Sequence, residues 1–380
     1  MNEPSDGPIA ELLSIGSELL VGETVDTNAA FLGAALARLG IPLRGARTLP
    51  DEQAAIAAAF TEARSRSDLV VATGGLGPTH DDLTREGLAE ALGESLSVDA
   101  GLVEELRARF AAFGRMPDAN LRQALRIPSA EALPNPIGSA PGWWVERDGS
   151  VSVLMPGVPS EMRRMWTEQV VPRLESRFTL RPVHTRTVKT FGIGESMVVE
   201  ATGDLLDNPG EGVSAGIYAR DDGVHLRFST RGDPSLLDTP VARAKALLAE
   251  HVYGTDDDEL TAVVLAALGQ AGVMTVASRE SGTQGTLLAA LAAVEPLEGA
   301  ARFVGGSLEG EGRGSPPGAD AVIELTLLPA DAHGRSRVRI SVSGAVTLSA
   351  VEVRTHGSGP QRLRRAAFAA LDQVRRAFSG

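Results

Sequence analysis

The stretch 70–84 constrains the fold more than any other part of the chain. It opens with the apolar run Val70–Thr73, which ends in a turn rich in glycine, at Gly74, Gly75 and Gly77. Such a run is typical of a buried parallel strand, and ligands in open α/β sheets bind just beyond the carboxyl ends of strands. Glycines there let backbone N–H groups come close to a phosphate. The stretch therefore predicts a phosphate-binding loop, with a plain strand-to-helix turn as the alternative.

Two adjacent carboxylates, Asp81 and Asp82, follow the glycine turn. Carboxylate oxygens are ligands that hard divalent cations prefer, so this pair can hold a metal against a bound phosphate. The alternative is that both side chains stabilise the N-terminus of the next helix through its dipole.

Patterns of strand and helix alternate along the first part of the chain. We predict strands at 9–15, 43–48 and 69–73 and helices at 29–39 and 52–66. This order predicts a mostly parallel sheet covered by helices on both faces. Further helices are expected at 83–92, 103–113 and 116–126, and the segment 16–28 is expected to be a polar loop.

A chain of 380 residues is long for a single core, so more than one domain is expected. The texture changes near residue 173, and the acidic segment 255–259 is interpreted as a linker. We predict an α/β protein with a three-layer αβα domain at 1–172, a small α+β domain at 173–254 and an α/β domain at 255–380.

Composition excludes several kinds of function. The net charge of −13 argues against nonspecific binding to nucleic acid or to anionic membranes. The chain has no cysteine, which excludes disulfides, thiolate zinc sites and cysteine nucleophiles. The polar segment 1–8 is not a signal peptide, and no apolar run approaches the roughly 20 residues of a membrane span. A cytoplasmic location is expected.

Four loops together resemble those of the CinA family, also called competence/damage-inducible protein A. They occur in order along the first domain and read Ile15-Gly16-Ser17-Glu18-Leu19-Leu20, Gly74-Gly75-Leu76-Gly77-Pro78-Thr79-His80-Asp81-Asp82, Asn135-Pro136-Ile137-Gly138-Ser139-Ala140-Pro141-Gly142 and Pro156-Gly157-Val158-Pro159-Ser160-Glu161-Met162. The resemblance implies a molybdopterin-binding-like first domain, a KH-like domain after it, and a C-terminal domain that often acts as a nicotinamide mononucleotide amidohydrolase. It also implies a homodimer.

The same resemblance implies that the first domain is a metal-dependent ADP-ribose pyrophosphatase, which splits its substrate into AMP and ribose 5-phosphate. The implied cation is magnesium, manganese or cobalt, with potassium as a further candidate. Diphosphate hydrolysis needs a metal to neutralise charge, donors for the phosphates and a group that directs the water. The candidates for catalysis and metal ligation are Asp81, Asp82 and Glu161. The candidates for substrate binding are Ser17, Glu18, Asn28, Gly74, Gly75, Gly77, Thr79, Asn135, Ser139, Ala140, Gly157 and Ser160.

Several of these residues have a structural alternative. Glu161 is also explained as a carboxylate in the first turn of a helix, with Ser160 nearby as a cap. Glu18 is also explained as a solvated loop residue. Asn28 either binds ligand or caps the helix that follows it.

The KH-like resemblance does not predict an RNA-binding domain. Nucleic-acid-binding KH modules clamp the backbone with a GXXG loop, whereas Phe191-Gly192-Ile193-Gly194-Glu195-Ser196 has closer glycines followed by an acid. Nucleic acid is therefore not expected as a partner, and this domain is interpreted as a spacer or dimer element.

The C-terminal domain resembles the amidohydrolase around Ser281, which stands in the nucleophile position. The tyrosine and lysine that support this serine in the family have no counterpart, since residues 254–380 contain neither type. A serine hydroxyl is a weak nucleophile without a positioned base, and arginine stays protonated. We predict that deamidase activity is lost and that Ser281 is a relic nucleophile or a helix cap.

Three functions remain in competition. Hydrolysis of ADP-ribose ranks first on the strength of the carboxylates. The alternatives are a molybdopterin- or nucleotide-binding protein and a non-catalytic scaffold protein related to competence.

Overall fold

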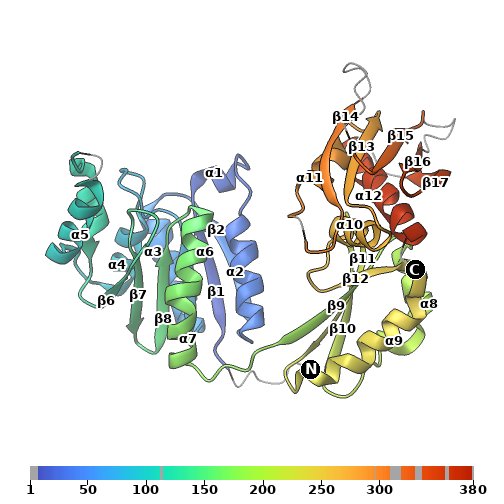
Figure 1. The fold of residues 1–380 in the computed structure, drawn as a ribbon. Coiled ribbons are helices and arrows are strands. Elements are labelled where there is room, and N and C mark those ends of the chain that lie inside the picture. The colour runs from blue at the N-terminus through green and yellow to red at the C-terminus, as the bar shows by residue number, and fades with distance from the viewer. Residues whose placement is uncertain are drawn as a thin grey trace. The chain divides into compact units, whose positions relative to one another are not determined.

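The computed structural model describes residues 7–111, 114–295, 297–308, 318–329, 336–355 and 359–378. The chain forms two compact units, Met1–Val183 and His184–Gly380 (Figure 1). The division into three domains at 172 and 254 stays a prediction.

A six-stranded sheet forms the centre of the N-terminal unit. Its strands follow the order β2-β1-β3-β8-β7-β6. They are β1 (Ala10–Ile15), β2 (Leu43–Leu49), β3 (Leu69–Thr73), β6 (Ala130–Leu133), β7 (Gly142–Arg147) and β8 (Ser150–Met155). Strands β2, β1, β3 and β8 run parallel, and β7 and β6 add an antiparallel edge. The predicted mostly parallel sheet is therefore confirmed.

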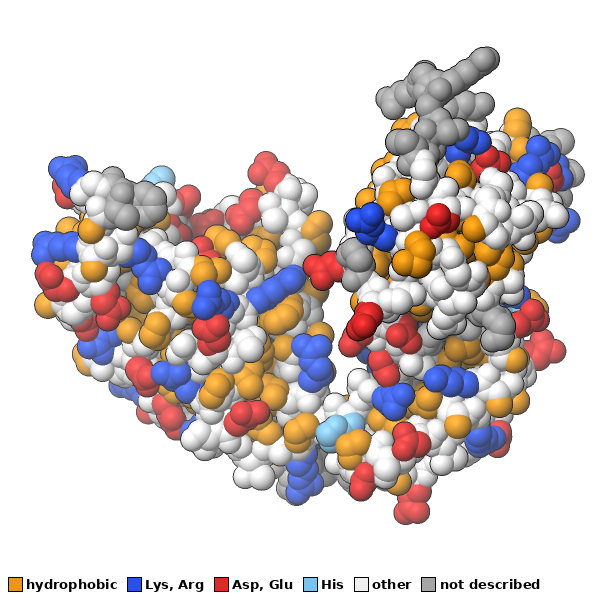
Figure 2. Space-filling view, viewed as in Figure 1, with side chains coloured by type: hydrophobic (Ala, Val, Ile, Leu, Met, Phe, Trp, Pro, Cys, Tyr) orange, Lys and Arg blue, Asp and Glu red, His pale blue; other side chains and the backbone are white. Residues whose placement is uncertain are grey.

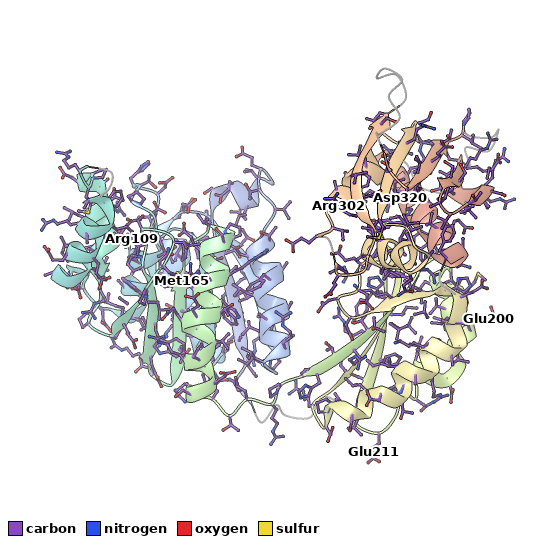
Figure 3. The ribbon with its side chains drawn as sticks, in the orientation of Figure 1. Arg109, Met165, Glu200, Glu211, Arg302 and Asp320 are labelled. Atoms are coloured by element: carbon purple, nitrogen blue, oxygen red, sulfur yellow. The ribbon has the colours of Figure 1, made fainter. Side chains whose placement is uncertain are left out.

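Helices cover both faces of this sheet (Figure 1). They are α2 (Thr27–Arg38), α3 (Gln53–Arg66), α4 (Thr84–Leu92), α6 (Pro159–Met165) and α7 (Val171–Arg177). The short helix α1 (Ser17–Leu20) follows β1 and buries no residue, and α5 (Ala100–Phe110) forms a small cluster of its own with Ala124. Neighbouring residues of a strand point to opposite faces of the sheet. The strands β1, β3 and β8 therefore contribute side chains to two hydrophobic cores, one on each face. Leu12 packs with α2, α6 and α7, whereas Leu13 packs with α3 and α4. Met165 of α6 belongs to the first core and is fully buried (Figure 3).

Two segments of this unit differ from their sequence predictions. The predicted helix 116–126 is a 3₁₀ helix, η2 (Asp118–Ala124), followed by β5 (Leu125–Arg126), which pairs with β4 (Ser97–Val98). Pro117 precedes this segment, and the residue before a proline is biased away from helical geometry. The predicted loop 16–28 contains the short helix α1 and the start of α2. A π-helical turn, η3 (Trp166–Val170), joins α6 to α7.

The C-terminal unit begins with an antiparallel sheet in the order β10-β11-β9-β12. Its strands are β9 (His184–Thr190), β10 (Val213–Arg220), β11 (Gly223–Thr230) and β12 (Val252–Thr255). Its helices are α8 (Glu195–Thr202) and α9 (Asp238–Leu248), with 3₁₀ turns η4 (Gly203–Leu205), η5 (Pro234–Leu237) and η6 (Ala249–His251). Helices and sheet share one core around Leu226 and Phe228.

The acidic segment 255–259 is held by local hydrogen bonds and an ion pair. Asp256 accepts a hydrogen bond of 2.8 Å from the Thr187 amide and pairs with Arg186 at 2.7 Å. Asp258 accepts one of 2.8 Å from the Thr255 amide. The bonds of Asp256 attach the segment to β9, and the bond of Asp258 closes a local turn, so these charges are used locally. The segment connects β12 to α10, and its role as a linker between domains stays a prediction.

A second sheet, of order β14-β13-β15-β16-β17, completes the C-terminal unit. Its strands are β13 (Thr275–Ser281), β14 (Arg302–Leu308), β15 (Ala321–Leu327), β16 (Ser336–Gly344) and β17 (Leu348–Thr355). Its helices are α10 (Leu260–Gln270), α11 (Thr286–Ala292) and α12 (Gly359–Phe378). Asp320, at the start of β15, accepts hydrogen bonds from the Met274 and Thr275 amides and so fixes the register with β13 (Figure 3). The predicted α/β class is confirmed.

Charged side chains of both signs are spread over the visible face of each unit (Figure 2). In the described part of the chain, no helix is long and apolar enough to cross a membrane.

Candidate functional site

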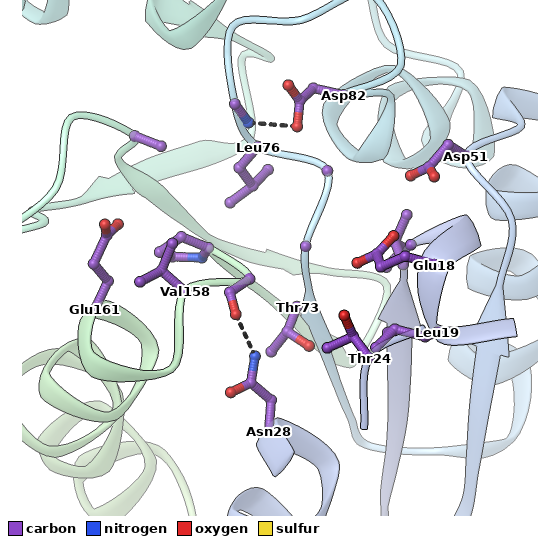
Figure 4. Close-up of a pocket in the computed structure, with 18 of the residues that line it drawn as sticks. Glu18, Leu19, Thr24, Asn28, Asp51, Thr73, Leu76, Asp82, Val158 and Glu161 are labelled. Carbon is purple, nitrogen blue, oxygen red and sulfur yellow. Dashed lines mark hydrogen bonds between the residues drawn. The ribbon is translucent and has the colours of Figure 1, made fainter. Parts of the chain in front are cut away.

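A cavity of about 510 Å³ lies at the carboxyl ends of β1, β3 and β8 (Figure 4). Three loops line it: the segment after Ile15, the glycine turn after Thr73 and the segment after Met155. This is the edge at which ligands bind in open α/β sheets. The structure therefore brings together three of the four loops that the sequence singles out, and Ser139 and Ala140 bring in the fourth.

The glycine turn adopts a backbone that side chains would prevent. Gly74 and Gly75 have φ angles of 95° and 62°, in the left-handed region that favours glycine. A Cβ on Gly74 would collide with the Ile15 carbonyl oxygen. The Thr84 hydroxyl donates a 2.8 Å hydrogen bond to the Gly74 carbonyl and so helps to hold the turn in place. The need for glycine here is therefore geometric.

Asp82 shapes the loop that follows. Its two carboxylate oxygens accept hydrogen bonds from the Gly77 amide at 2.7 Å and the Thr79 amide at 2.8 Å, and the Thr79 hydroxyl donates to it as well. Asp82 thus holds residues 77–79 in place, a role that the sequence did not predict.

Asp81 has a different environment. Its side chain is exposed, and a hydrogen bond from Thr79 lowers the pKa of the Asp81 carboxyl below its ordinary value. Asp81 is therefore ionised at neutral pH and faces the cavity. The two adjacent aspartates differ because Asp82 accepts two backbone amide hydrogen bonds of the loop, whereas Asp81 is exposed at the cavity.

Arg85 joins the glycine loop to the loop 135–142. Its guanidinium donates to the Leu76 carbonyl at 3.0 Å and to the Pro141 carbonyl at 3.1 Å, and lies 6.0 Å from the centroid of the Trp143 ring. Burial lowers the pKa of Arg85 to about 10. Sequence reasoning missed this residue. The sequence did contain a signal for its burial, because Arg85 stands three positions before Leu88 and so lies on the apolar face of α4.

Glu161 is held by Asn135. The Asn135 amide group donates to the Glu161 carboxylate at 2.7 Å and to the Ala140 carbonyl at 3.0 Å. A Cβ on Gly138 would meet the same carboxylate, so a larger residue there would displace the Glu161 side chain. Ser160 is not a helix cap, because α6 begins after Val158 as its N-cap. That interpretation is corrected.

Asn28 is buried in the first turn of α2 and does not cap it. Asp26 is the cap, since its carboxylate accepts a 2.8 Å hydrogen bond from the Ala29 amide. Asn28 donates to the Gly157 carbonyl at 2.7 Å, while its Oδ1 has no partner among the described residues. The residue is 7% exposed and lines the cavity (Figure 4). Asn28 thus brings a buried polar atom without a described partner to the wall of the cavity.

Three predicted residues do not line the cavity: Ser17, Asn135 and Ser160. The Ser17 amide donates to the Asp51 carboxylate at 2.8 Å, and Asp51 lies in the lining. Asp51 and Gln123 are lining residues that sequence reasoning missed. Asp51 had a usable signal, because it follows the end of β2 at the same edge of the sheet.

The cavity is strongly acidic. Among the described residues that line it, none carries a positive charge, and the carboxylates are Glu18, Asp26, Asp51, Asp81, Asp82 and Glu161. Within the described ranges no three His, Cys, Asp or Glu side chains are grouped so as to hold a metal ion. Asp81, Asp82 and Glu161 therefore do not form a ready-made metal shell.

In the C-terminal unit, Ser281 is the last residue of β13. Its neighbour Glu280 is 1% exposed and accepts hydrogen bonds from the Leu287 and Leu288 amides at 3.0 and 2.6 Å and from the Thr283 hydroxyl at 2.7 Å. Glu280 thus satisfies amides at the start of α11. Both interpretations of Ser281, as a relic nucleophile or as a helix cap, stay predictions.

Comparison with known proteins identifies the family. Residues 11–176 match the model "Probable molybdopterin binding domain", and residues 185–254 match "Damage-inducible protein CinA KH domain". A CinA-like protein of Thermomicrobium roseum is 47% identical over 296 residues, which cover 76% of this chain and 72% of that protein. The chain belongs to the CinA family. A CinA-like protein of Deinococcus deserti is 43% identical over 288 residues, 74% of this chain and 71% of that protein.

Solved structures also resemble part of this CinA family member. The protein CinA of Thermoplasma acidophilum, of unknown function, is 35% identical with a TM-score of 0.42 and covers 45% of this chain and 98% of that one. The molybdopterin biosynthesis enzyme MoaB of Thermus thermophilus is 23% identical with a TM-score of 0.30 and covers 44% of this chain and 91% of that one.

The comparisons correct the function ranked first from the sequence. The relatives are named only as CinA-like proteins, the matching model describes a molybdopterin binding domain, and nothing in them indicates ADP-ribose hydrolysis. The prediction of an ADP-ribose pyrophosphatase is therefore wrong. The alternative of a molybdopterin- or nucleotide-binding protein fits these findings better.

Proposed function

We propose that the N-terminal unit binds a small phosphate-bearing molecule of the pterin or nucleotide type, together with a divalent cation, in the cavity at the carboxyl ends of β1, β3 and β8. The observation that carries the proposal is the pairing of a turn that only glycine can form with an acidic wall free of described cationic residues. The family model for this domain supports it.

The charge of the wall argues for the cation. An unaccompanied phosphate would be repelled by six carboxylates, and the amides of the glycine turn supply only partial charges. Mg²⁺ is commonly bound through one or two carboxylates together with phosphate oxygens and water. Exposed and ionised Asp81 fits that requirement, and no group of three protein ligands is needed.

The remainder of the cavity suits a ring system. Its volume of about 510 Å³ lies in the range of roughly 300–1,000 Å³ that is usual for small-ligand sites. Leu76, Ala140 and Val158 supply apolar contacts, and the unpartnered Asn28 Oδ1 accepts a hydrogen bond. Pterins and purines both carry ring or exocyclic N–H groups that match it.

The test is isothermal titration of the full chain with AMP, ADP, ADP-ribose and molybdopterin, each with and without MgCl₂. We expect at least one ligand to bind, and Mg²⁺ to tighten its binding. Asp81→Asn should remove most of the Mg²⁺ effect. Glu104→Gln, an exposed carboxylate that does not line the cavity, is the matched control and should leave it unchanged.

A second variant tests the ring contact. Asn28→Leu should weaken the ligand while keeping the Mg²⁺ effect. Absence of binding for all four ligands under both conditions, in protein shown to be folded, would overturn the proposal. So would an equal Mg²⁺ effect in Asp81→Asn and the wild type.

Other expectations stay predictions with their own tests. A homodimer is tested by light scattering after size exclusion, and a cytoplasmic location by cell fractionation. That the chain is a hydrolase of any kind is tested by product analysis of the titrated ligands. The loss of nicotinamide mononucleotide deamidase activity is tested by ammonia release, and a role for potassium by replacing it with sodium.

A further inference from the structure

A second cavity, of about 400 Å³, lies inside the C-terminal unit. Four segments line it: the loop Phe191–Glu195, the hairpin end 219–224 formed by β10 and β11, residues 353–355 at the end of β17, and helix α12. It therefore lies where the antiparallel sheet of β9–β12 meets the last strand and helix of the chain.

Helix α12 is fastened to that sheet beside the cavity. Arg375 donates to the backbone carbonyls of Val252 at 3.1 Å and Glu250 at 2.6 Å. Arg376 forms ion pairs of 2.8 Å with Glu250 and Asp372. The buried Asp372 also holds Arg375 at 2.7 Å. Because these groups are mutually satisfied, the walls of the cavity are fixed relative to one another.

Two glycines in the loop Phe191–Glu195 leave room for helix α12 and for the cavity. Gly192 has a φ of 74°, and a Cβ there would lie 3.1 Å from an Arg376 nitrogen, so glycine lets α12 approach. Gly194 is the N-cap of α8, which has no side-chain capping bond, and a Cβ built on it meets nothing within 4 Å. Gly192 and Gly194 thus form one wall of the cavity.

The cavity combines an apolar body with an excess of positive charge. Its apolar lining includes Phe191, Ile193, Val224, Val353 and Ala369. Its charged lining is Arg220, Arg354, Arg365, Glu195 and Asp221. Asp221 already pairs with Arg364 at 3.3 Å. Within the described residues neither Arg354 nor Arg365 forms an ion pair, so guanidinium groups outnumber the uncommitted carboxylate.

The lining of this cavity also includes a buried side chain with a hydroxyl group, that of Thr355. Thr355 is 5% exposed and lines the cavity, and its Oγ1 has no hydrogen-bond partner in the described part of the chain. Buried polar atoms in native proteins are almost always partnered, so this hydroxyl points to a missing polar group. It is an observation independent of the arginines and of the helix terminus.

We propose that this cavity binds a small amphipathic organic anion, an apolar ring that carries a carboxylate, sulfonate or phosphate group. The ring would pack among the apolar side chains, the anionic group would meet Arg354 and Arg365, and the Thr355 hydroxyl would bond to a polar atom of the ligand. This site is separate from the cavity of the N-terminal unit and takes its anion without a metal.

The probe is 8-anilinonaphthalene-1-sulfonate, an aromatic anion that fluoresces in apolar surroundings, titrated into the full chain. N-phenyl-1-naphthylamine is its uncharged counterpart. We expect saturable binding of one sulfonate per chain, displaced by phenyl phosphate or 1-naphthoate. Arg365→Gln should weaken the sulfonate about tenfold, as for loss of one charged hydrogen bond, and should leave the uncharged probe unchanged.

Two further variants distinguish binding of the probe in this cavity from nonspecific uptake elsewhere on the protein. Gly194→Phe places a ring in open space at the cavity wall and should abolish binding of both probes. Arg337→Gln removes an exposed arginine that does not line the cavity and should bind like the wild type. Thermal unfolding followed by circular dichroism checks each fold, because loosened proteins also take up the sulfonate.

The outcomes that overturn the proposal are distinct. Unsaturable uptake, or equal affinity in Arg365→Gln and Arg337→Gln, shows that the arginines do not select an anion. Undiminished binding in a folded Gly194→Phe variant shows that the probe lies elsewhere.

Discussion

The unequal roles of Asp81 and Asp82 give the sharpest prediction about the glycine loop. We expect Asp82→Ala to destabilise the N-terminal unit and Asp81→Ala to leave its stability almost unchanged. The reason is that the Asp82 carboxylate accepts two amide hydrogen bonds, at 2.7 and 2.8 Å, and one from a hydroxyl. Asp81 instead lies exposed at the cavity.

The magnitude follows from those three bonds. A hydrogen bond to a charged group contributes about 1.5–3 kcal/mol, which sets an upper limit of several kcal/mol for Asp82. Thr79 is exposed, so water replaces part of what is lost there. A net loss of about 2 kcal/mol is expected, which corresponds to roughly 4–8 °C in Tm for a unit of this size.

Tryptophan fluorescence measures this unit selectively in the full chain. The chain has three tryptophans, and they are Trp143, Trp144 and Trp166, all buried in the N-terminal unit. Urea and thermal unfolding followed by their emission therefore report that unit alone. Equal midpoints for Asp82→Ala and Asp81→Ala, with equal m-values, would refute the assignment of a loop-shaping role to Asp82.

Three further predictions concern charged groups, of which Arg85 and Glu280 are buried and Asp222 is half-buried. Arg85→Met leaves two loop carbonyls without donors and should lower the stability of the N-terminal unit by about 2 kcal/mol in tryptophan-monitored urea unfolding; a loss near zero contradicts this. Burial raises the pKa of Asp222, but hydrogen bonds from His225 and Tyr253 outweigh burial and lower it to about 2. Its stabilisation, about 1–2 kcal/mol after screening, is therefore present above pH 4 and lost as the pH falls toward 2. The stability gap between wild type and Asp222→Asn in circular dichroism should narrow over that range, and a constant gap is the contrary result. Glu280→Ala leaves the start of α11 uncapped and should cost about 2–3 kcal/mol by the same method, whereas an unchanged midpoint would show that the cap is dispensable.

Local patterns predicted the sheet and the glycine turn because those features depend on nearby residues. The apolar run Val70–Thr73 can be buried on both faces only inside a parallel sheet, and its burial is complete. The turn at Gly74 needs a left-handed backbone, which the sequence signals directly. In both cases the residue type and the structure are linked within a few positions.

Choices between neighbouring residues could not be made from the sequence. Asp26 and Asn28 are both good N-caps, and only the start of α2 shows that Asp26 does it. Asp81 and Asp82 are chemically identical, and their roles separate because the loop turns one carboxylate back onto its own amides. The exact start of a helix decides the first case, and the path of the loop backbone decides the second.

Contacts between distant segments were also beyond the sequence. Arg85 bonds to the Pro141 carbonyl, 56 positions away, and Asp51 reaches the Ser17 amide across 34 positions. The cavity in the C-terminal unit joins Phe191 to Arg365. Such partners are set by how the sheets and helices pack, which a pattern of residue types does not specify.

The two cavities show why net charge says little about ligands. The chain as a whole carries −13, yet one cavity has an arginine-rich wall and the other has an acidic wall without described cations. We expect both to take anions, the first through guanidinium groups and the second through a cation and backbone amides. A chelator should therefore release the ligand of the acidic cavity and leave 8-anilinonaphthalene-1-sulfonate bound at the other. Loss of both ligands on chelation would mean that the two sites do not differ in the way that their charges require.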